Sequence, residues 1–144
     1  MLGKLCDVIV PADEISPSAS GAGVPYYLDS VLFYATPEEQ KAWRSGLELV
    51  ERAAATKFGK PFEECPAEEQ EQVVADMAKH EGSPETPLEQ FFAPLKSMTM
   101  TAYWLSDAGM QQYLGYRGDT VMKEFPGCTH REHQASRDPG RNSG

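Results

Sequence analysis

The sequence predicts an all-α fold: a small helical domain of five or six helices with long loops and an extended C-terminal arm. Apolar residues recur at three- and four-residue spacing in several segments, which is the pattern of helices with one buried face. Threonine followed by proline and then glutamate marks two helix starts. Apolar and polar residues alternate over no sustained β-branched stretch, so no sheet is expected.

The first helix is expected within residues 2–10, where apolar residues return at helical spacing. Its apolar face comprises Leu2, Leu5, Ile9 and, beside them, Cys6. Pro11 limits the length of this helix, because proline lacks an amide hydrogen and disfavours helical geometry in the preceding residue. Residues 11–23 are rich in proline, serine and glycine, and this composition predicts a loop.

Proline also marks the start of the next two helices. Pro25 occupies a first helical position. The residues spaced for burial after it are Leu28, Val31, Leu32 and Tyr34. Thr36 begins the third helix, because Pro37 fits its first position and Glu39 completes a capping box; that helix is expected to end near Gly59. Its apolar face comprises Trp43, Leu47, Val50 and Ala54.

A fourth helix opens at residues 65–66 and is expected to break at residues 82–84. Its inward residues are Val73, Val74 and Met77. Thr86 and Glu89 repeat the capping-box start for a longer fifth helix. The apolar pattern of this helix consists of Leu88, Phe91, Phe92, Leu95, Met98, Thr99, Ala102 and Leu105. Pro94 falls within the pattern and is expected to bend the helix, since proline removes a backbone hydrogen bond.

The chain is expected to form a single domain over residues 1–128, followed by a flexible tail over residues 129–144. Ser106 and Asp107 predict the cap of a short helix that Gly115 closes. From about residue 117 the composition predicts an extended arm lying on the domain or on a partner. The apolar anchors of this arm are Val121, Met122 and Phe125.

Composition and charge exclude several classes of protein. The net charge of -9, from 22 acidic and 13 basic residues, argues against nucleic-acid binding, because no basic stripe is present to displace phosphate counterions. No apolar run approaches the roughly 20 residues that a membrane span needs. Three cysteines are too few and too scattered for a disulfide framework or a zinc module, although one pair has the option of bridging in an oxidising compartment.

Two groups of residues are candidates for metal or acid-base chemistry. Asp13 and Glu14 are adjacent carboxylates in a loop, where bonding to backbone amides is the favoured interpretation. Cys128, His130 and His133 resemble part of a zinc site but have no obvious fourth ligand. The sequence contains no nucleophile elbow and no glycine-rich nucleotide loop. A small metal-dependent enzyme built on these five residues therefore stays an alternative rather than the main prediction.

Residues 91–116 carry much contact surface and no reactive cluster, which favours binding of a partner. The predicted core face comprises Phe91, Leu95, Met98 and Ala102, and Met100, Tyr103 and Trp104 lie off it. Because a small domain struggles to bury both sides of one helix, a second covered surface is expected. The predicted partner-binding residues are Met100, Tyr103, Trp104, Met110, Tyr113, Tyr116 and Phe125. A homo-oligomeric adaptor is a further alternative.

Three stretches of the chain resemble one protein family. They are LCDVIVPADEISPSASGAGVPYYLD near the start, FFAPLKSMTMTAYWLSDAGM in the second half, and LGY followed later by PGC. In this order they resemble the gluconate 2-dehydrogenase subunit 3 family, over residues 2–128. Members of that family are small, cofactor-free partners of large flavin-dependent sugar or polyol dehydrogenases of the glucose-methanol-choline type.

The resemblance implies a non-catalytic small subunit that needs no cofactor of its own. Its partner would be a large subunit that binds FAD and oxidises an alcohol, while this chain would stabilise, escort or shape that partner. Whether a cytochrome c subunit joins the assembly stays open. Family members typically carry a twin-arginine leader that exports both subunits together, which implies a periplasmic location. The sequence shows no such leader, so a cytoplasmic location remains an alternative.

Overall fold

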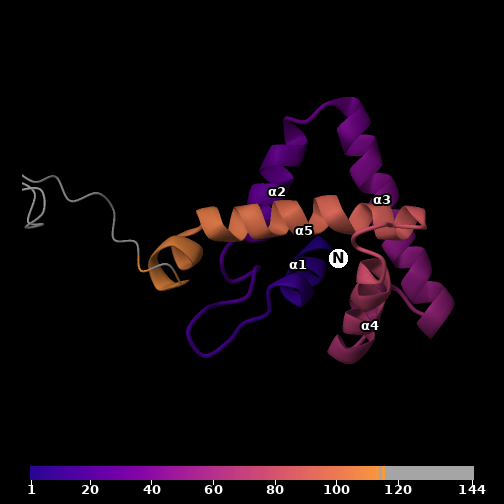
Figure 1. The fold of residues 1–144 in the computed structure, drawn as a ribbon, viewed down its shortest axis with the longest axis horizontal. Coiled ribbons are helices and arrows are strands. Elements are labelled where there is room, and N and C mark those ends of the chain that lie inside the picture. Colours follow the sequence, from indigo (N-terminus) through magenta and orange to yellow (C-terminus); the bar gives the residue numbers. More distant parts are fainter. Residues whose placement is uncertain (114, 116–144) are drawn as a thin grey trace, which may run out of the picture.

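The structure is a computed structural model that describes residues 1–113 and residue 115 (Figure 1). Its elements are α1 (Leu2–Ile9), α2 (Val24–Phe33), α3 (Pro37–Phe58), the 3-10 turn η1 (Phe62–Glu64), α4 (Ala67–Ala78), α5 (Pro87–Leu105) and the π-helical turn η2 (Ala108–Tyr113). The described residues include no strand, which confirms the predicted all-α class. The predicted arm and tail, from residue 117 onward, lie outside the described residues.

Helix α5 is the central element, and α1, α2, α3, α4 and η2 all contact it (Figure 1). Its buried side chains are Glu89, Phe91, Phe92, Leu95, Thr99, Ala102 and Tyr103. This confirms Phe91, Leu95 and Ala102 as core residues, whereas Leu105 is exposed because the helix ends there, at the rim of the domain. Pro94 lies on the exposed side of α5, and the helix continues through it.

The predicted helix starts are confirmed at atomic detail. Thr36 Oγ1 accepts the amide of Glu39 at 3.2 Å, and the Glu39 carboxylate accepts the Thr36 amide at 2.9 Å. Thr86 and Glu89 make the same reciprocal pair at the start of α5. Such a box satisfies amides that have no partner within the helix. Gly59 ends α3 with φ of 72°, a left-handed conformation that glycine adopts without steric cost.

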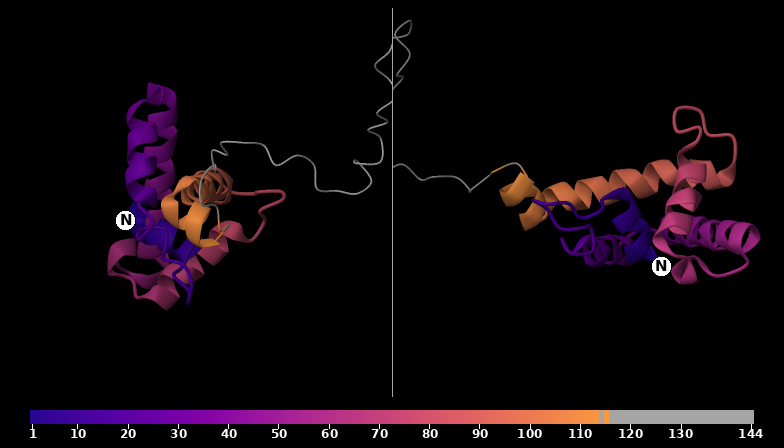
Figure 2. Two further views of the ribbon diagram at one scale, coloured as in Figure 1. Left: turned by 90° about the vertical axis from the view of Figure 1, so that its left-hand side faces the viewer. Right: turned by 90° about the horizontal axis from the view of Figure 1, so that it is seen from below.

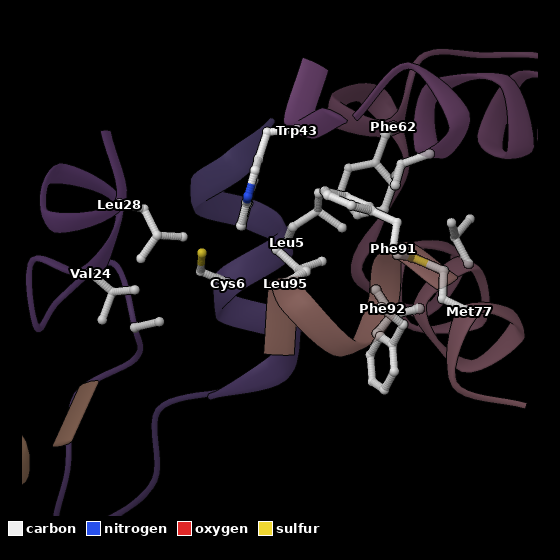
Figure 3. Close-up of a cluster of buried hydrophobic side chains, with 14 of the residues drawn as sticks. Leu5, Cys6, Val24, Leu28, Trp43, Phe62, Met77, Phe91, Phe92 and Leu95 are labelled. Atoms are coloured by element: carbon white, nitrogen blue, oxygen red, sulfur yellow. The ribbon is translucent and has the colours of Figure 1, made fainter. Parts of the chain in front are cut away.

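The core gathers side chains from all five α-helices and η1 (Figure 3). The ten that Figure 3 labels are Leu5, Cys6, Val24, Leu28, Trp43, Phe62, Met77, Phe91, Phe92 and Leu95. Phe62 is fully buried, yet its three-residue turn has no periodicity to reveal it in the sequence. Cys6 and Cys65 are buried free thiols, so they do not bridge each other, and burial raises the pKa of Cys6. Cys128 lies outside the described residues.

Two burial predictions for α2 are wrong. Val31 and Tyr34 are exposed, although both belong to the apolar pattern predicted for burial. Helix α2 buries only the side that bears Val24 and Leu28. The rest of α2 projects, together with the first turns of α3, away from the other helices (Figures 1 and 2). Spacing predicted that α2 is amphipathic but could not predict how much of it a neighbour covers.

Helices α3 and α5 are in tight contact at Gly46. The Phe91 ring lies over this glycine and packs edge-to-face on Trp43, with ring centroids 5.3 Å apart and planes at 85°. A Cβ atom on Gly46 would stand 2.2 Å from Phe91 Cδ2. Buried side chains are close-packed, and a ring held between two helices has little freedom to move. Glycine at this mid-helix position is therefore required by the approach of α5.

Substituting Gly46→Ala is expected to destabilise the domain. Alanine favours a helix over glycine by about 1 kcal/mol, but overpacking a core costs roughly 1–3 kcal/mol. We expect the steric cost of the added methyl group to exceed its gain in helix propensity. The free energy of unfolding, measured with urea, should therefore fall by about 1–2 kcal/mol. Ser45→Ala, on the exposed side of α3, is the control and should change stability by less than about 0.5 kcal/mol. Equal or greater stability of Gly46→Ala would contradict the packing argument.

Glu89 joins the end of α4 to the start of α5. Its carboxylate accepts the amides of Glu85 and Thr86 at 2.6 and 3.1 Å, and it lies 3.0 Å from His80 Nδ1. Hydrogen bonds hold the pKa of Glu89 below its ordinary value. The largest effect comes from the Glu85 amide, followed by the His80 side chain and the Thr86 amide. The charged form of this buried side chain is therefore stabilised by folding.

The lowered pKa of Glu89 predicts a loss of stability in acid. A carboxyl group with a lower pKa in the folded state contributes stability above its unfolded pKa, about 4.3, and loses it as the pH falls through the folded value. We expect the free energy of unfolding to decline less between about pH 6 and pH 3 in Glu89→Gln than in the wild type. Glu71→Gln, exposed on α4, should keep the wild-type slope. Parallel pH profiles for wild type and Glu89→Gln would refute this role.

Candidate partner-binding surface

The most exposed apolar side chains of the described residues concentrate on α2. We call Tyr26, Tyr27, Val31, Phe33 and Tyr34 the α2 aromatic face. Tyr26, Phe33 and Tyr34 are 82%, 74% and 86% exposed. Only Asp29 and Ser30 interrupt this exposed side with polar groups. Contiguous apolar surface of this kind is typical of protein interaction sites, and single exposed residues are not.

The α2 aromatic face ends at the tip of a hairpin formed by α2 and α3 (Figure 1). Phe33 and Tyr34 stand side by side there in an edge-to-face contact, with centroids 5.0 Å apart and planes at 88°. This contact orients two large rings toward solvent without burying either. In Figure 2 the hairpin tip stands clear of the body of the domain, so both sides of the tip are accessible to another protein.

A hollow of about 200 Å³ continues the aromatic face toward the end of α5. It is lined by Ala22, Gly23, Val24, Tyr27, Ala102, Leu105 and Ser106. Tyr27 from α2 and Leu105 from α5 are its two exposed apolar members. Because its other residues are small or buried, the hollow is shaped to receive a bulky apolar side chain between these two.

The predicted contact residues differ in how far they are buried. Tyr103 is only 2% exposed, and its hydroxyl donates to the Pro17 carbonyl at 3.0 Å. The prediction that Tyr103 lies off the core face is therefore wrong: the loop before α2 folds over this side of α5 and covers the ring. Met100 and Trp104 are half-buried and line a groove of about 280 Å³. The groove also contains Ile9, Val10, Pro11, Asp13, Ser16 and Tyr103.

Residues after α5 belong to the same end of the domain. Ser106 Oγ accepts the amide of Gly109 at 3.2 Å, which confirms the predicted cap of the short helix. A Cβ atom on Gly109 would stand 2.2 Å from the Tyr103 carbonyl, so η2 can fold back closely only with glycine there. Met110 is half-buried in η2. The Tyr113 side chain, Tyr116 and Phe125 lie outside the described part of the structure.

Sequence reasoning missed the α2 aromatic face as a binding surface. It assigned Val31 and Tyr34 to the core because apolar residues recur along this segment. Val31 is three residues from the buried Leu28, but no residue three or four positions from Tyr34 is buried. One signal was available: large apolar residues lie on every side of α2, and a single neighbouring helix covers only one stripe of such a helix. The number of apolar residues on α2, rather than their spacing, indicates that this helix makes a second contact.

The Asp13 carboxylate has a structural role in its loop. One of its oxygens accepts the amides of Ile15 and Ser16 at 2.9 and 2.7 Å and the Ser16 hydroxyl at 2.8 Å. These bonds lower the pKa of Asp13, the largest effect being that of the Ile15 amide, and they confirm the favoured interpretation of this loop. Glu14 is exposed beside it.

The metal alternative gains no support from residues 1–113. Within this part of the chain, no three His, Cys, Asp or Glu side chains come together as a metal site. Cys128, His130 and His133 lie outside it. Within the described residues, no helix has the length and hydropathy to cross a bilayer.

Comparison with known proteins gives one match. A family model described as Gluconate 2-dehydrogenase subunit 3 matches residues 1–127. This range covers all the described elements, from α1 to η2, including the α2 aromatic face. No curated protein and no solved structure matches the chain.

Removing the Tyr103 hydroxyl is expected to loosen the loop that covers α5. Tyr103→Phe keeps the buried ring but leaves the Pro17 carbonyl without this donor. A lost intramolecular hydrogen bond costs about 0.5–1.5 kcal/mol, and we expect a loss of that size in the free energy of unfolding. Tyr26→Phe, which removes a hydroxyl from an exposed ring, should leave stability unchanged. A loss as large for Tyr26→Phe would contradict the specific role of the Tyr103 bond.

Proposed function

Since the chain belongs to the gluconate 2-dehydrogenase subunit 3 family, we propose that it is a non-catalytic small subunit that binds and stabilises a large FAD-dependent dehydrogenase. The family match extends over 127 of the 144 residues, so the proposal concerns the whole helical domain. The family's description makes it part of a dehydrogenase assembly. What this chain contributes to such an assembly is argued from its surface.

The observation that carries the proposal is the α2 aromatic face. Large aromatic side chains each bury about 150–250 Å² when covered, and this face offers three tyrosines and a phenylalanine. Together they supply several hundred of the roughly 800 Å² that each partner contributes to an interface of standard size. Tyrosine is enriched among the residues that dominate binding energy, because it buries much area and loses little side-chain entropy.

The catalytic groups and the cofactor are proposed to reside in the partner. A flavin supplies the electron-accepting chemistry of alcohol oxidation, and the protein around it supplies binding and orientation. By family resemblance the partner is a glucose-methanol-choline-type subunit acting on a sugar or polyol. This chain would hold that subunit in its folded form, since a protein that binds only the native state of its partner stabilises it by mass action.

Two further proposals rest on the family resemblance alone. The assembly works in the periplasm, where this chain escorts the large subunit during export. A cytochrome c subunit completes the assembly as the electron acceptor. Cell fractionation and a haem-stained gel of the purified complex test the two separately, and a purely cytoplasmic or haem-free complex would reject the corresponding proposal.

Co-purification from the native cell tests the central proposal. The full chain, carrying an affinity tag, should recover a large companion that shows the flavin absorption spectrum and oxidises sugar or polyol alcohols with an artificial electron acceptor. Recovery of the chain as a defined homo-oligomer without a flavoprotein would favour the adaptor alternative. Stoichiometric zinc that disappears on substitution of His130 and His133 would favour the metal-enzyme alternative.

Substitutions on the α2 aromatic face are expected to weaken the complex without unfolding the small subunit. Tyr34→Ala and Phe33→Ala should each raise the dissociation constant about 10-fold or more, the effect of losing a residue that contributes over about 1.4 kcal/mol. Their melting temperatures should stay close to that of the wild type, because both side chains are exposed. Ile15→Ala, an exposed apolar side chain on a loop, is the control. Unchanged affinity in both α2 variants would show that the partner binds elsewhere.

A further inference from the structure

Gln40 closes the tip of the α2–α3 hairpin. Its Nε2 lies 3.0 Å from the Leu32 carbonyl, 3.2 Å from that of Phe33 and 3.3 Å from that of Ala35. Carbonyls at the C-terminal end of a helix have no partner within the helix and need donors from elsewhere. The amide nitrogen of glutamine carries two hydrogens, so it is shared among these three acceptors. A side chain of α3 thereby caps the end of α2.

The same turn is fixed from the α3 side. Pro37 occupies the first turn of α3, and the capping box of Thr36 and Glu39 closes its start. The amide of Ala35 donates to the Leu32 carbonyl at 3.2 Å. Gln40 follows the capping box by one residue. The donor that satisfies the last carbonyls of α2 and the capping box that begins α3 therefore lie within one short connection.

Below the tip, side chains leave a groove between α2 and α3, although Leu32 and Leu47 pack against the core. A groove of about 260 Å³ separates α2 from α3. Its lining consists of Asp29, Leu32, Phe33, Gln40, Trp43, Arg44 and Leu47. In Figure 1 the two helices diverge from the tip toward the core, where Leu28 and Trp43 are buried. Side chains on the open side of this groove lack partner atoms across it, so fewer contacts hold α2 against α3 at the tip than at the core.

We propose that Gln40 is a positioning residue that preforms the docking tip of the small subunit. The inference rests on the proposed function, namely that the catalytic subunit binds the α2 aromatic face. Gln40 acts on this contact through the backbone: it holds the last turn of α2, so that Phe33 and Tyr34 are already oriented when the partner arrives. A binding element that is rigid before association loses less entropy on binding, which strengthens the complex.

The first test uses the free small subunit and needs no partner. Gln40→Met keeps the length of the side chain and removes both donors. Amide hydrogen exchange in residues 30–36 should accelerate severalfold in this variant, while exchange in α4 and α5 stays unchanged. Gln72→Met, an exposed glutamine on α4, is the matched control and should leave residues 30–36 unaffected. Unchanged exchange in Gln40→Met would overturn the inference whatever the partner proves to be.

The second test measures affinity for the purified catalytic subunit. Gln40→Met should raise the dissociation constant about 3- to 10-fold, the equivalent of losing one or two net hydrogen bonds that order the tip. In a Tyr34→Ala background the same substitution should have clearly less effect, because Gln40 acts through the orientation of that ring. A full effect in both backgrounds would mean that Gln40 supports the fold generally, and the inference would fail.

The Gln40→Glu variant tests whether the effect depends on the hydrogen-bond donors of the side chain or on its shape. Gln40→Glu places a carboxylate against three carbonyl oxygens at neutral pH, so binding should weaken at least as much as in Gln40→Met. The three carbonyl oxygens disfavour the ionised form and should raise the pKa of this carboxyl above its ordinary value of about 4.3. Protonation supplies one O–H donor, so affinity relative to wild type should partly recover at about pH 5. Gln72→Glu controls for the added charge. A constant deficit at both pH values would contradict the donor role.

These tests separate the inference from the function on which it rests. Weaker binding by Tyr34→Ala together with wild-type binding by Gln40→Met rejects only the role of Gln40. Wild-type binding by Phe33→Ala, Tyr34→Ala and Gln40→Met together rejects the docking surface as well. Recovery of the chain without a flavoprotein companion rejects the proposed function, while the hydrogen-exchange result still decides whether Gln40 orders the tip.

Discussion

The close approach of α5 to α3 at Gly46 is the contact on which the rest of the structure depends. The Phe91 ring occupies the space that a side chain at position 46 would fill and meets Trp43 edge-to-face. This contact sets how deeply the long helix α5 lies in the domain. Helices α1, α2 and α4 then pack along the same central helix, so their positions follow from where α5 lies. Close packing makes such an arrangement intolerant of one extra carbon atom.

Placing α5 at the centre also decides which surfaces stay uncovered. The side of α5 that bears Tyr103 is closed by the loop before α2, through the hydrogen bond to Pro17. Helix α2 packs on the core through Val24, Leu28 and the partly buried Leu32, and its exposed apolar side chains are those of the α2 aromatic face. The exposed aromatic residues are thus a consequence of a hairpin whose base lies in the core and whose tip extends beyond it. A polar contact, the Gln40 amide on the carbonyls of α2, orders this tip beyond the buried residues of the hairpin.

Local features of the fold were predictable from the sequence, and the surface was not. The capping boxes at Thr36 and Thr86 depend on residues three apart, so their chemistry can be recognised without knowing any neighbour. The predicted contact side of α5 was wrong for Tyr103, because the covering loop comes from residues about 86 positions earlier. Val31 and Tyr34 belong to the apolar pattern of this segment, yet both side chains are exposed among the described residues. Helical periodicity shows which residues lie on the same side of a helix. It does not show how many sides of that helix are covered by neighbouring elements.

By itself, the sequence determined the helical class, the capped starts of α3 and α5, the glycine that ends α3 and the resemblance to a family of dehydrogenase subunits. These follow from proline, glycine, caps and spacing, which act within a few residues of the chain. The sequence did not determine every helix end: α4 stops at Ala78, before the break expected at residues 82–84. Only the tertiary structure decided that Gly46 must lack a side chain, that Tyr103 is core and that the α2 aromatic face is open. Each of these depends on which distant helix or loop arrives at a given side. Burial is a property of neighbouring segments in space, and the order of residues alone does not specify which segments become neighbours.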